Sequence, residues 1–577
     1  MKRQMKKLMA LTCAAALAVP FSAYASEAAE ECTFTWLLDD GVESIYYDSY
    51  DENPVAKYWQ SMEWDADGDG AGEKIAITYQ VPPAGAQGDN FNTLLGTGEL
   101  PEIVSMSYSS QNAQSLYEDG VILDLTEYVE KYMPNYLAWM EEHPEKAASM
   151  TNDGKYLMLY NVADVPEDPW GGYMYRRDWL VQYGTNPETG EAFTGGWNED
   201  KTEWTDNVVF PSGGSDPVYI SDWEWMLGIL NEAIEREGIE GGYAFQLYYT
   251  GFLSTGDFNS GFGTPMCNYL DEDGVVKNGL TSEGARAYLQ CMNTWYENGW
   301  INQDFEENVS DTFFMVDMAG TYSGKVGCWY GLTGQIGNGM AGEGMEDICV
   351  YGAAQPINDV YGDDSCKGKE PNCFFETDIV STGICITEKA AEKDLATLCT
   401  ALDYFYGSEG ALLRTYGFSD EQQAEIQDAY YNENGFENGV YTAVEEDGKT
   451  VYQIDPNRDA LNMAIPLNGF RMIGMAANDN IDWGRDQVMQ HSIDEQKKYT
   501  ATAAVGSTVI NQMTSDQSAE VSTISANLMT YTAQAIPSFI IGRTEIDDDA
   551  QWQSYCDEIA AYGIDTWVGY LNEALGR

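Results

Sequence analysis

The chain has 577 residues, a length beyond what one hydrophobic core usually organises, so at least two lobes are expected. It carries 94 Asp and Glu against 29 Lys and Arg, a net charge of −65, and this field disfavours nucleic acid and anionic membrane surfaces as partners. Aromatic residues make up 13% of the chain, a surplus that suits recognition of flat, amphipathic ligands.

The first 25 residues are predicted to be a secretory signal peptide. Four basic residues precede an apolar run over 8–19, and Ala23 and Ala25 stand where a signal peptidase reads small side chains, so cleavage is expected after Ala25. The run is too short to span a bilayer, and Cys13 matches a lipid-attachment pattern poorly. We therefore expect an exported protein, extracellular or associated with the cell surface, whose anchoring the sequence leaves open.

Cleavage at this point makes the chain still more acidic. It removes four basic residues and no acidic one, leaving 25 Lys and Arg against 94 Asp and Glu, or −69. A polyanionic ligand is disfavoured unless a local basic pocket overrides this field. A solvated acidic surface that keeps the protein soluble also accounts for the charge.

An acidic, glycine-rich loop follows the first predicted strand, which covers 33–38. Its oxygen donors are Asp65, Asp67, Asp69 and Glu73 at loop positions 1, 3, 5 and 9, with the carbonyl of Ala71 at position 7. Gly70 occupies position 6, where an EF-hand-like calcium loop turns sharply, but Ala76 stands at position 12 instead of the usual bidentate Glu. The loop is therefore either a structural Ca²⁺ site or an acidic turn before the next strand.

Short apolar runs alternate with helical segments along the rest of the chain, which is the pattern of α/β lobes. Further strands are predicted over 74–80 and 102–106, and helices over 90–96, 111–119, 222–238, 282–298, 390–406 and 552–562. Between 185 and 221 the residues Gly, Pro, Thr and Asn predict turns and a small hairpin inserted into a lobe.

The cysteine and histidine residues limit which disulfides and catalytic sites the chain can form. Cys366 and Cys373 flank a polar loop and are candidates for a disulfide, whereas Cys in apolar runs are expected to be buried thiols. The chain has only two histidines, His143 and His491, which argues against a Ser-His-Asp or Cys-His catalytic site. Paired carboxylates for glycoside hydrolysis stay open among 94 acidic residues.

Seven segments in a fixed order resemble the extracellular solute-binding proteins that deliver carbohydrates to ABC transporters, including maltose-type receptors. They are LLGTGELPEIVSM (94–106), YEDGVILDLTEYVEKYMPNYLAWM (117–140), DGKYLMLYNV (153–162), GYMYRRDWLVQYG (172–184), GKVGCWYGLTGQ (324–335), STGICITEKAAEKDLATLCTALDYFYGSEGALLRTYG (381–417) and FIIGRTEIDDDAQWQSYCDEIAAYGIDTWVGYLNEAL (539–575). The sixth, with its Tyr-Phe-Tyr-x-x-Glu-Gly turn, is the most specific. The lipid-attachment pattern is missing and 185–221 is an insertion, so the chain departs from the family at both places.

The resemblance implies an α/β, two-lobed, periplasmic-binding-protein-like type II fold with the ligand cleft between the lobes. One lobe would comprise 26–168 and 376–460, and the other 169–375 and 461–577 with the insertion. Closure of the lobes around a ligand by a hinge in the crossover segments is the motion expected of this fold.

Candidate ligand contacts are aromatic side chains, because a sugar ring offers apolar C–H faces for stacking and a rim of hydroxyls for polar groups. The candidates are Tyr108, Tyr249, Trp329, Tyr330 and Trp483. Trp329 and Tyr330 are adjacent on a predicted strand and point to opposite faces, so each faces either ligand or core.

The sequence therefore predicts a non-enzymatic, monomeric receptor that captures a carbohydrate, in the first place a neutral oligosaccharide, and hands it to ABC-transporter permease subunits. A secreted glycan-cleaving enzyme is the alternative, and a surface adhesin or scaffold comes third. Peptide and polyamine ligands also stay open. Apart from one Ca²⁺ ion, no cofactor is expected.

Overall fold

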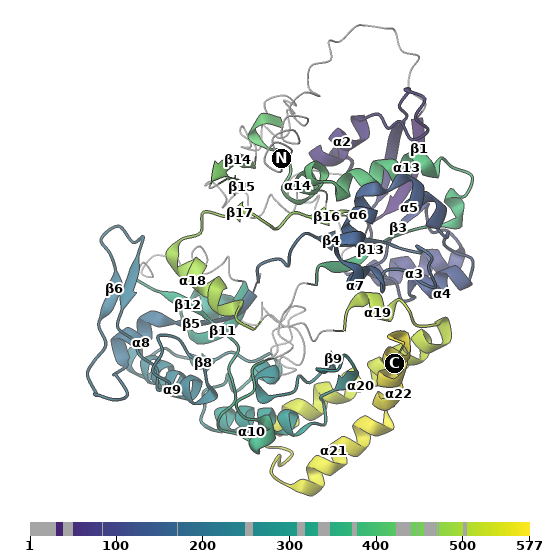
Figure 1. Cartoon of the computed structure of the whole chain (residues 1–577). Coiled ribbons are helices and arrows are strands. Elements are labelled where there is room, and N and C mark those ends of the chain that lie inside the picture. Colours follow the sequence, from purple (N-terminus) through teal and green to yellow (C-terminus); the bar gives the residue numbers. More distant parts are fainter. Residues whose placement is uncertain are drawn as a thin grey trace, which may run out of the picture.

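The two largest sheets in the computed structural model of the chain are mixed, and each has its own hydrophobic core (Figure 1). It describes residues 31–38, 50–83, 85–169, 171–248, 258–307, 318–332, 347–371, 378–422, 440–446, 448–454, 470, 472–499 and 505–576. The predicted signal peptide and Cys373 lie outside these residues. The two-lobed α/β fold class predicted from the sequence is confirmed.

The first lobe is built on a six-stranded sheet in the order β16-β4-β13-β3-β1-β2. Its strands are β1 (Glu31–Leu37), β2 (Lys74–Gln80), β3 (Ile103–Ser105), β4 (Leu159–Ala163), β13 (Val380–Ile386) and β16 (Met475–Ala476). β1, β2 and β3 are parallel, and β13 lies between β3 and β4, antiparallel to both. Because β16 runs parallel to β4, the carboxyl ends of five strands lie at one edge of this sheet.

Helices cover this sheet and bury one large core. They are α2 (Pro54–Ser61), α3 (Gln87–Thr97), α4 (Ala113–Glu118), α5 (Thr126–Tyr132), α6 (Pro134–Glu142), α7 (Pro144–Ala147), α13 (Leu395–Asp403) and α14 (Ser408–Tyr416). Beside them β14 (Tyr441–Glu446), β15 (Lys449–Ile454) and β17 (Ile481–Asp482) form a small separate sheet. Trp36 and Trp59 are fully buried and both pack against Phe470, which joins early and late parts of the chain in one core.

The second lobe is built on a four-stranded sheet in the order β12-β5-β11-β8. The strands are β5 (Gly171–Arg176), β8 (Tyr243–Phe245), β11 (Val326–Leu332) and β12 (Val350–Ala353). The helices are α8 (Arg177–Tyr183), α9 (Ile220–Glu237), α10 (Glu283–Glu297), α11 (Met318–Tyr322), α18 (Gln487–Gln496), α20 (Ser515–Ile540), α21 (Asp549–Ala561) and α22 (Ile564–Ala574). Two small hairpins complete it: β6 (Gly195–Trp197) with β7 (Trp204–Asp206), and β9 (Asn268–Leu270) with β10 (Val276–Asn278).

Three crossovers connect the lobes, so each lobe combines segments distant in sequence; Figure 1 shows purple and green parts in the first lobe and blue, teal and yellow parts in the second. The first crossover follows β4 and leads to β5, the second leads into β13, and the third follows β16 and leads to α18. Ile473 and Ala477 belong to the core of the first lobe, and Val488 belongs to that of the second. The change of lobe therefore comes after residue 477, later than the sequence-based division at residue 460.

The C-terminal part makes a further connection. Nδ2 of Asn112, at the start of α4, donates to the carbonyls of Ile510 (3.0 Å) and Met513 (2.7 Å), beside α19 (Ser507–Ile510). Further along, α20 packs on α10 of the second lobe. The described parts of 461–577 thus contact both lobes rather than the second alone. Among the described residues, none of the helices is both long and apolar enough to cross a bilayer.

Most predicted elements are present with shifted ends. The strand 74–80 is β2, the helix near Asp222 is α9 ending before Gly238, and the hairpin within 185–221 is β6–β7. The helix expected over 390–406 is shorter: α13 starts after Asp394, whose side chain accepts the backbone N–H of Thr397. An Asp in this N-cap position starts a helix because it satisfies an otherwise unpaired N–H.

Candidate functional site

A cavity of about 430 Å³ lies at the carboxyl edge of the first sheet, where β4 and β16 end and β13 begins. Its lining includes Glu167 of the first crossover, Asp378 before β13 and Asn478 of the third crossover. All three connections between the lobes therefore border one cavity. Ligands of open α/β folds bind beyond the carboxyl ends of the strands, so this position is the candidate ligand site.

The floor of the cavity is a connected polar surface. Arg414 of α14 donates from Nη2 to Oδ1 of Asn161 (3.1 Å), and from Nε to the carbonyl of Ile473 (2.9 Å). Nδ2 of Asn161 donates in turn to the carbonyl of Thr382 (2.9 Å). The guanidinium and the amide are thus held in place before any ligand arrives, which lowers the entropy cost of binding.

Charge in this cavity is mixed. Oδ1 of Asp378 forms an ion pair with Lys146 of α7 at 2.6 Å, and Glu167 supplies a second carboxylate. Ser381, on the exposed side of β13, adds a hydroxyl to the lining. Carboxylate, amide, guanidinium and hydroxyl groups together can donate to and accept from the hydroxyl rim of a sugar.

One carboxylate ties two crossovers together beside this cavity. Asp168, in the first crossover, pairs with Arg485 in the third and with Lys497 just after α18. Burial alone would raise the pKa of Asp168, but hydrogen bonds from Lys497 and Arg485 outweigh it, and the pKa lies below its ordinary value. The ionised carboxylate of Asp168 is therefore the form that links the first and third crossovers.

Tyr108, one of the predicted ligand contacts, lies at the same edge of the first sheet as the cavity. It follows β3 and lines a small recess with Leu38 and Ser105, which stand at the ends of β1 and β3. Its side chain is 42% exposed, so its ring has a free surface. Stacking on a ligand stays a prediction for this residue.

Trp329 and Tyr330 lie on β11 and point to opposite faces of the second sheet. Tyr330 has no exposed surface and packs edge-on against Tyr173, with the ring centroids 5.2 Å apart. Trp329, 6% exposed, packs in a small cluster with Met174 and Val350. Tyr330 lies in the large core of the second lobe and Trp329 in the small cluster, so both faces of β11 are covered and both rings serve as core here.

Trp483 and Tyr249 complete the predicted set. Trp483 lies in the third crossover, half-buried, against the ring of Tyr416 and under the guanidinium of Arg485. Tyr249 lies outside the described residues. Of the predicted aromatic residues that the structure describes, Trp483 and Tyr108 combine an exposed surface with a position at the crossovers or the sheet edge.

The loop before β2 brings the predicted calcium ligands together. Oxygens of Asp65, Asp67 and Asp69 lie within 4.8 Å of one another. Asp65 accepts the backbone N–H groups of Gly68 (2.8 Å) and Gly70 (3.1 Å), which fixes its carboxylate on the inside of the loop. Three carboxylates in an exposed loop are a donor set of the kind that Ca²⁺ takes, so these residues fit the ion.

The other two predicted calcium ligands belong to the same loop. The backbone N–H of Ala71 donates to Asp69, and Glu73 pairs through its backbone with Trp64, closing the loop. The carboxylate of Glu73 is not among the three that converge. Its role as a ligand stays a prediction.

The polar residues of the cavity were not among the sequence-based candidates. They come from segments around 161, 167, 378–382, 414 and 478, which the fold alone brings together. The one sequence signal was weak: two small polar residues, Ser381 and Thr382, interrupt an otherwise apolar strand near its start. Cys366 is buried with its Sγ 3.2 Å from the carbonyl of Asp363, and its predicted pairing with Cys373 remains a prediction.

Solved structures resemble the chain over nearly its whole length. The alginate-binding protein AlgQ2, in a structure without calcium ion, is 16% identical over 96% of this chain and 99% of its own, with a TM-score of 0.63. An HMO-binding, ABC-transporter-associated solute-binding protein from Bifidobacterium longum infantis is 16% identical over 95% and 99%, with a TM-score of 0.66. The substrate-binding protein FusA of S. pneumoniae, as an EF-hand mutant in complex with fructo-nystose, is 14% identical over 94% and 98%, with a TM-score of 0.61.

At these identities the likeness establishes the fold, which is that of the ABC-transporter solute-binding proteins. No protein-family model matches the sequence, and no curated protein sequence matches it.

Proposed function

We propose that this chain is the extracellular substrate-binding component of an ABC importer, which captures an oligosaccharide between its two lobes and delivers it to the permease. The observation that carries the proposal is the cavity bordered by all three crossovers, because closure of the lobes there would enclose a ligand. The similar structures support it, since their names describe binding proteins for carbohydrates.

A neutral oligosaccharide is the ligand class that we favour. The lining offers one guanidinium, Arg414, against the carboxylates Glu167 and Asp378, and Asp378 already pairs with Lys146. The mature chain carries a large negative charge in addition. A polyanionic sugar would meet repulsion from both, whereas hydroxyl groups can bond to every polar group in the cavity.

Export and calcium belong to the same proposal. Residues 1–25 would direct secretion and be removed after Ala25, so the receptor would act outside the membrane that holds its permease. One Ca²⁺ ion in the loop of Asp65, Asp67 and Asp69 would stabilise the entry to β2. The loop lies on the first lobe, and its role would be structural rather than part of ligand capture.

The test is a thermal-shift and calorimetric screen of the mature protein against neutral and acidic oligosaccharides, followed by chromatography of the recovered sugar. A ligand at a hundredfold excess over its dissociation constant stabilises the native state by about 2.7 kcal/mol. Recovery of the bound sugar intact would support the receptor. Its cleavage would instead establish the glycan-cleaving enzyme.

A matched pair of variants places the binding site. Ser381→Trp fills the cavity from the exposed side of β13, whereas Ser522→Trp puts the same ring on the exposed face of α20. We expect the first variant to lose binding and the second to retain it, with both folding normally. Equal binding by both variants would contradict a ligand site in this cavity.

A further inference from the structure

We propose that Asp216, His491 and Glu495 form a second cation site, which takes a divalent transition metal of the zinc class and fastens α18 to the loop before α9. The three residues place one imidazole nitrogen and two carboxylate oxygens within 4.8 Å of one another. The site lies in the second lobe, apart from both the cavity and the acidic loop of the first lobe.

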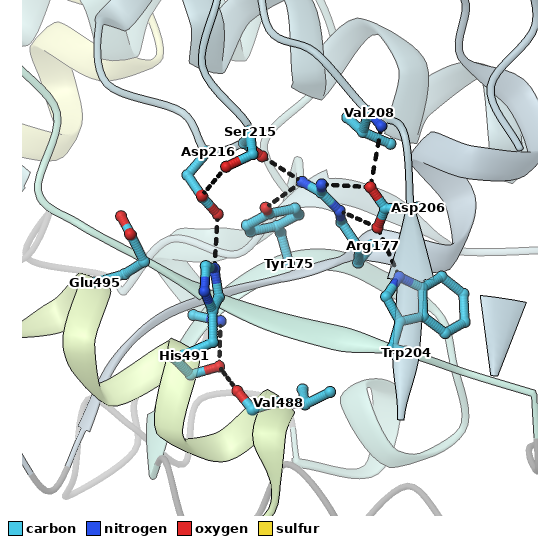
Figure 2. A network of polar contacts seen from close by, with 12 residues as sticks. Tyr175, Arg177, Trp204, Asp206, Val208, Ser215, Asp216, Val488, His491 and Glu495 are labelled. Atoms are coloured by element: carbon cyan, nitrogen blue, oxygen red, sulfur yellow. Dashed lines mark hydrogen bonds and ion pairs between the residues drawn. The ribbon is translucent and has the colours of Figure 1, made fainter. Parts of the chain in front are cut away.

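The donors come from two elements that face each other. His491 and Glu495 stand four residues apart on α18, so both side chains project from one face of the helix. Asp216 belongs to the loop between β7 and α9 on the opposite side. Figure 2 shows the His491 imidazole directed at Asp216, with Glu495 projecting from the same helix beside it. Nε2 of His491 lies 2.8 Å from Oδ1 of Asp216.

Both sides of the site are held in place by contacts outside it. Arg177 donates from Nη1 to the carbonyl of Ser215 (2.7 Å), which fixes the loop next to Asp216. On α18, Oγ of Ser492 accepts the backbone N–H of Gly352 (2.7 Å), which anchors the helix to β12. A metal site needs this kind of support, because its ligands must keep their geometry when the ion binds.

Burial makes a cation at this point favourable. The side chains of Asp216 and Glu495 are only 9% and 8% exposed, so two carboxylates lie close together in a largely desolvated space. Arg177 is committed to Asp206, Tyr175 and the Ser215 carbonyl. Two buried carboxylates favour positive charge beside them, and a divalent ion supplies more of it than the Lys498 ammonium that pairs with Glu495.

The remaining contacts leave room for the ion. Oδ2 of Asp216 accepts from the Ser215 hydroxyl, which leaves Oδ1 directed at His491. Both carboxylate oxygens of Glu495 accept from Lys498, whose side chain is 47% exposed and can turn to solvent when a metal takes its place. One imidazole and two carboxylates match the ligands of zinc, and the half-exposed edge of His491 admits water as a fourth.

The test uses Zn²⁺ as the probe on the mature protein, with Ca²⁺ in excess so that the acidic loop is saturated. The chain has only two histidines, so the imidazole region of its proton NMR spectrum contains two sets of signals. We expect one equivalent of Zn²⁺ to shift the signals of His491 and leave those of His143 in place. Co²⁺ should give the ligand-field absorption of a low-symmetry site at the same stoichiometry.

Three variants decide the assignment. His491→Ala and the isosteric Glu495→Gln should each weaken Zn²⁺ binding in calorimetry by more than about 100-fold, because each removes a direct ligand. His143→Ala, the matched control, should bind as the unmodified protein does. Circular dichroism of each variant verifies its fold. Unchanged affinity in Glu495→Gln, or a response confined to His143, would overturn the proposal.

Discussion

Oδ2 of Asp168 accepts a hydrogen bond from Nη1 of Arg485, so one side chain joins the first and third crossovers. The pair is mostly shielded, with the Arg485 side chain 14% exposed and that of Asp168 26%. We expect Asp168→Asn to lower the free energy of unfolding by about 1 kcal/mol at neutral pH. Urea denaturation measures this difference. The control, Glu232→Gln, breaks the exposed pair with Arg236 and should change the free energy of unfolding little.

The same variant predicts a pH dependence with a definite sign. Because the pKa of Asp168 is lower in the folded protein than in the unfolded chain, its contribution is fully present above the ordinary carboxyl pKa. It is lost as the pH falls through the folded value. The difference between the unmodified protein and Asp168→Asn should therefore shrink as the pH falls below the ordinary carboxyl pKa of about 4. A difference that stays constant over this range would contradict the ion pair.

Replacement by Ala should affect sugar binding at Tyr108 and stability at Tyr330. Tyr108→Ala removes a ring that is 42% exposed, so stability should change by less than about 0.5 kcal/mol while sugar affinity falls about tenfold. Tyr330→Ala opens a hole in the second core and should cost about 3–5 kcal/mol. Calorimetry and thermal denaturation separate the two effects. Met529→Ala, at a 68% exposed site on α20, controls for loss of exposed apolar surface and should change neither.

Gly383 allows β13 to lie close to β4. A Cβ at this position would stand 1.8 Å from the carbonyl oxygen of Leu159, a contact that no relaxation of a side chain can relieve. Gly383→Ala should therefore destabilise the first lobe by about 2–3 kcal/mol. Gly228, inside α9 with no atom within 4 Å of its added Cβ, is the control. Gly228→Ala should be neutral or stabilising by up to about 1 kcal/mol, measured by urea denaturation.

Calcium should stabilise the protein through the loop before β2. Ca²⁺ is expected to raise the melting temperature of the unmodified protein, and Asp65→Asn with Asp67→Asn should abolish the rise. The control variant, Glu141→Gln with Glu142→Gln, removes the same charge from exposed positions at the end of α6. Its melting temperature should still rise on addition of Ca²⁺. A calcium response that survives the loss of both Asp65 and Asp67 would place the ion elsewhere.

The sequence predicted individual strands and helices well, because each depends on residues that are close together in the chain. The strand 74–80 alternates buried and less buried residues along β2, and Ser282 caps α10 as its sequence position suggests. The acidic loop was also predictable, since its donors lie within nine consecutive residues. In each case a few neighbouring side chains determine the structure.

The cavity could not be predicted in this way. Glu167, Asp378 and Asn478 are brought together by the sheet order, and no pattern around any one of them indicates the others. Trp329 and Tyr330 illustrate the second limit. An apolar strand such as β11 does not reveal which of its faces the rest of the chain will cover, and here both are covered.

The position of β13 has a consequence for how this protein must be made. Its residues pair with β3 on one side and β4 on the other, although the whole sheet-forming part of the second lobe precedes them in the chain. Until Val380–Ile386 arrives, β3 and β4 present unpaired edges, which are templates for aggregation. Pairings so distant in sequence also form slowly. Export led by the N-terminus, which is part of the proposed function, would therefore require protection of the early strands until the late strand has emerged.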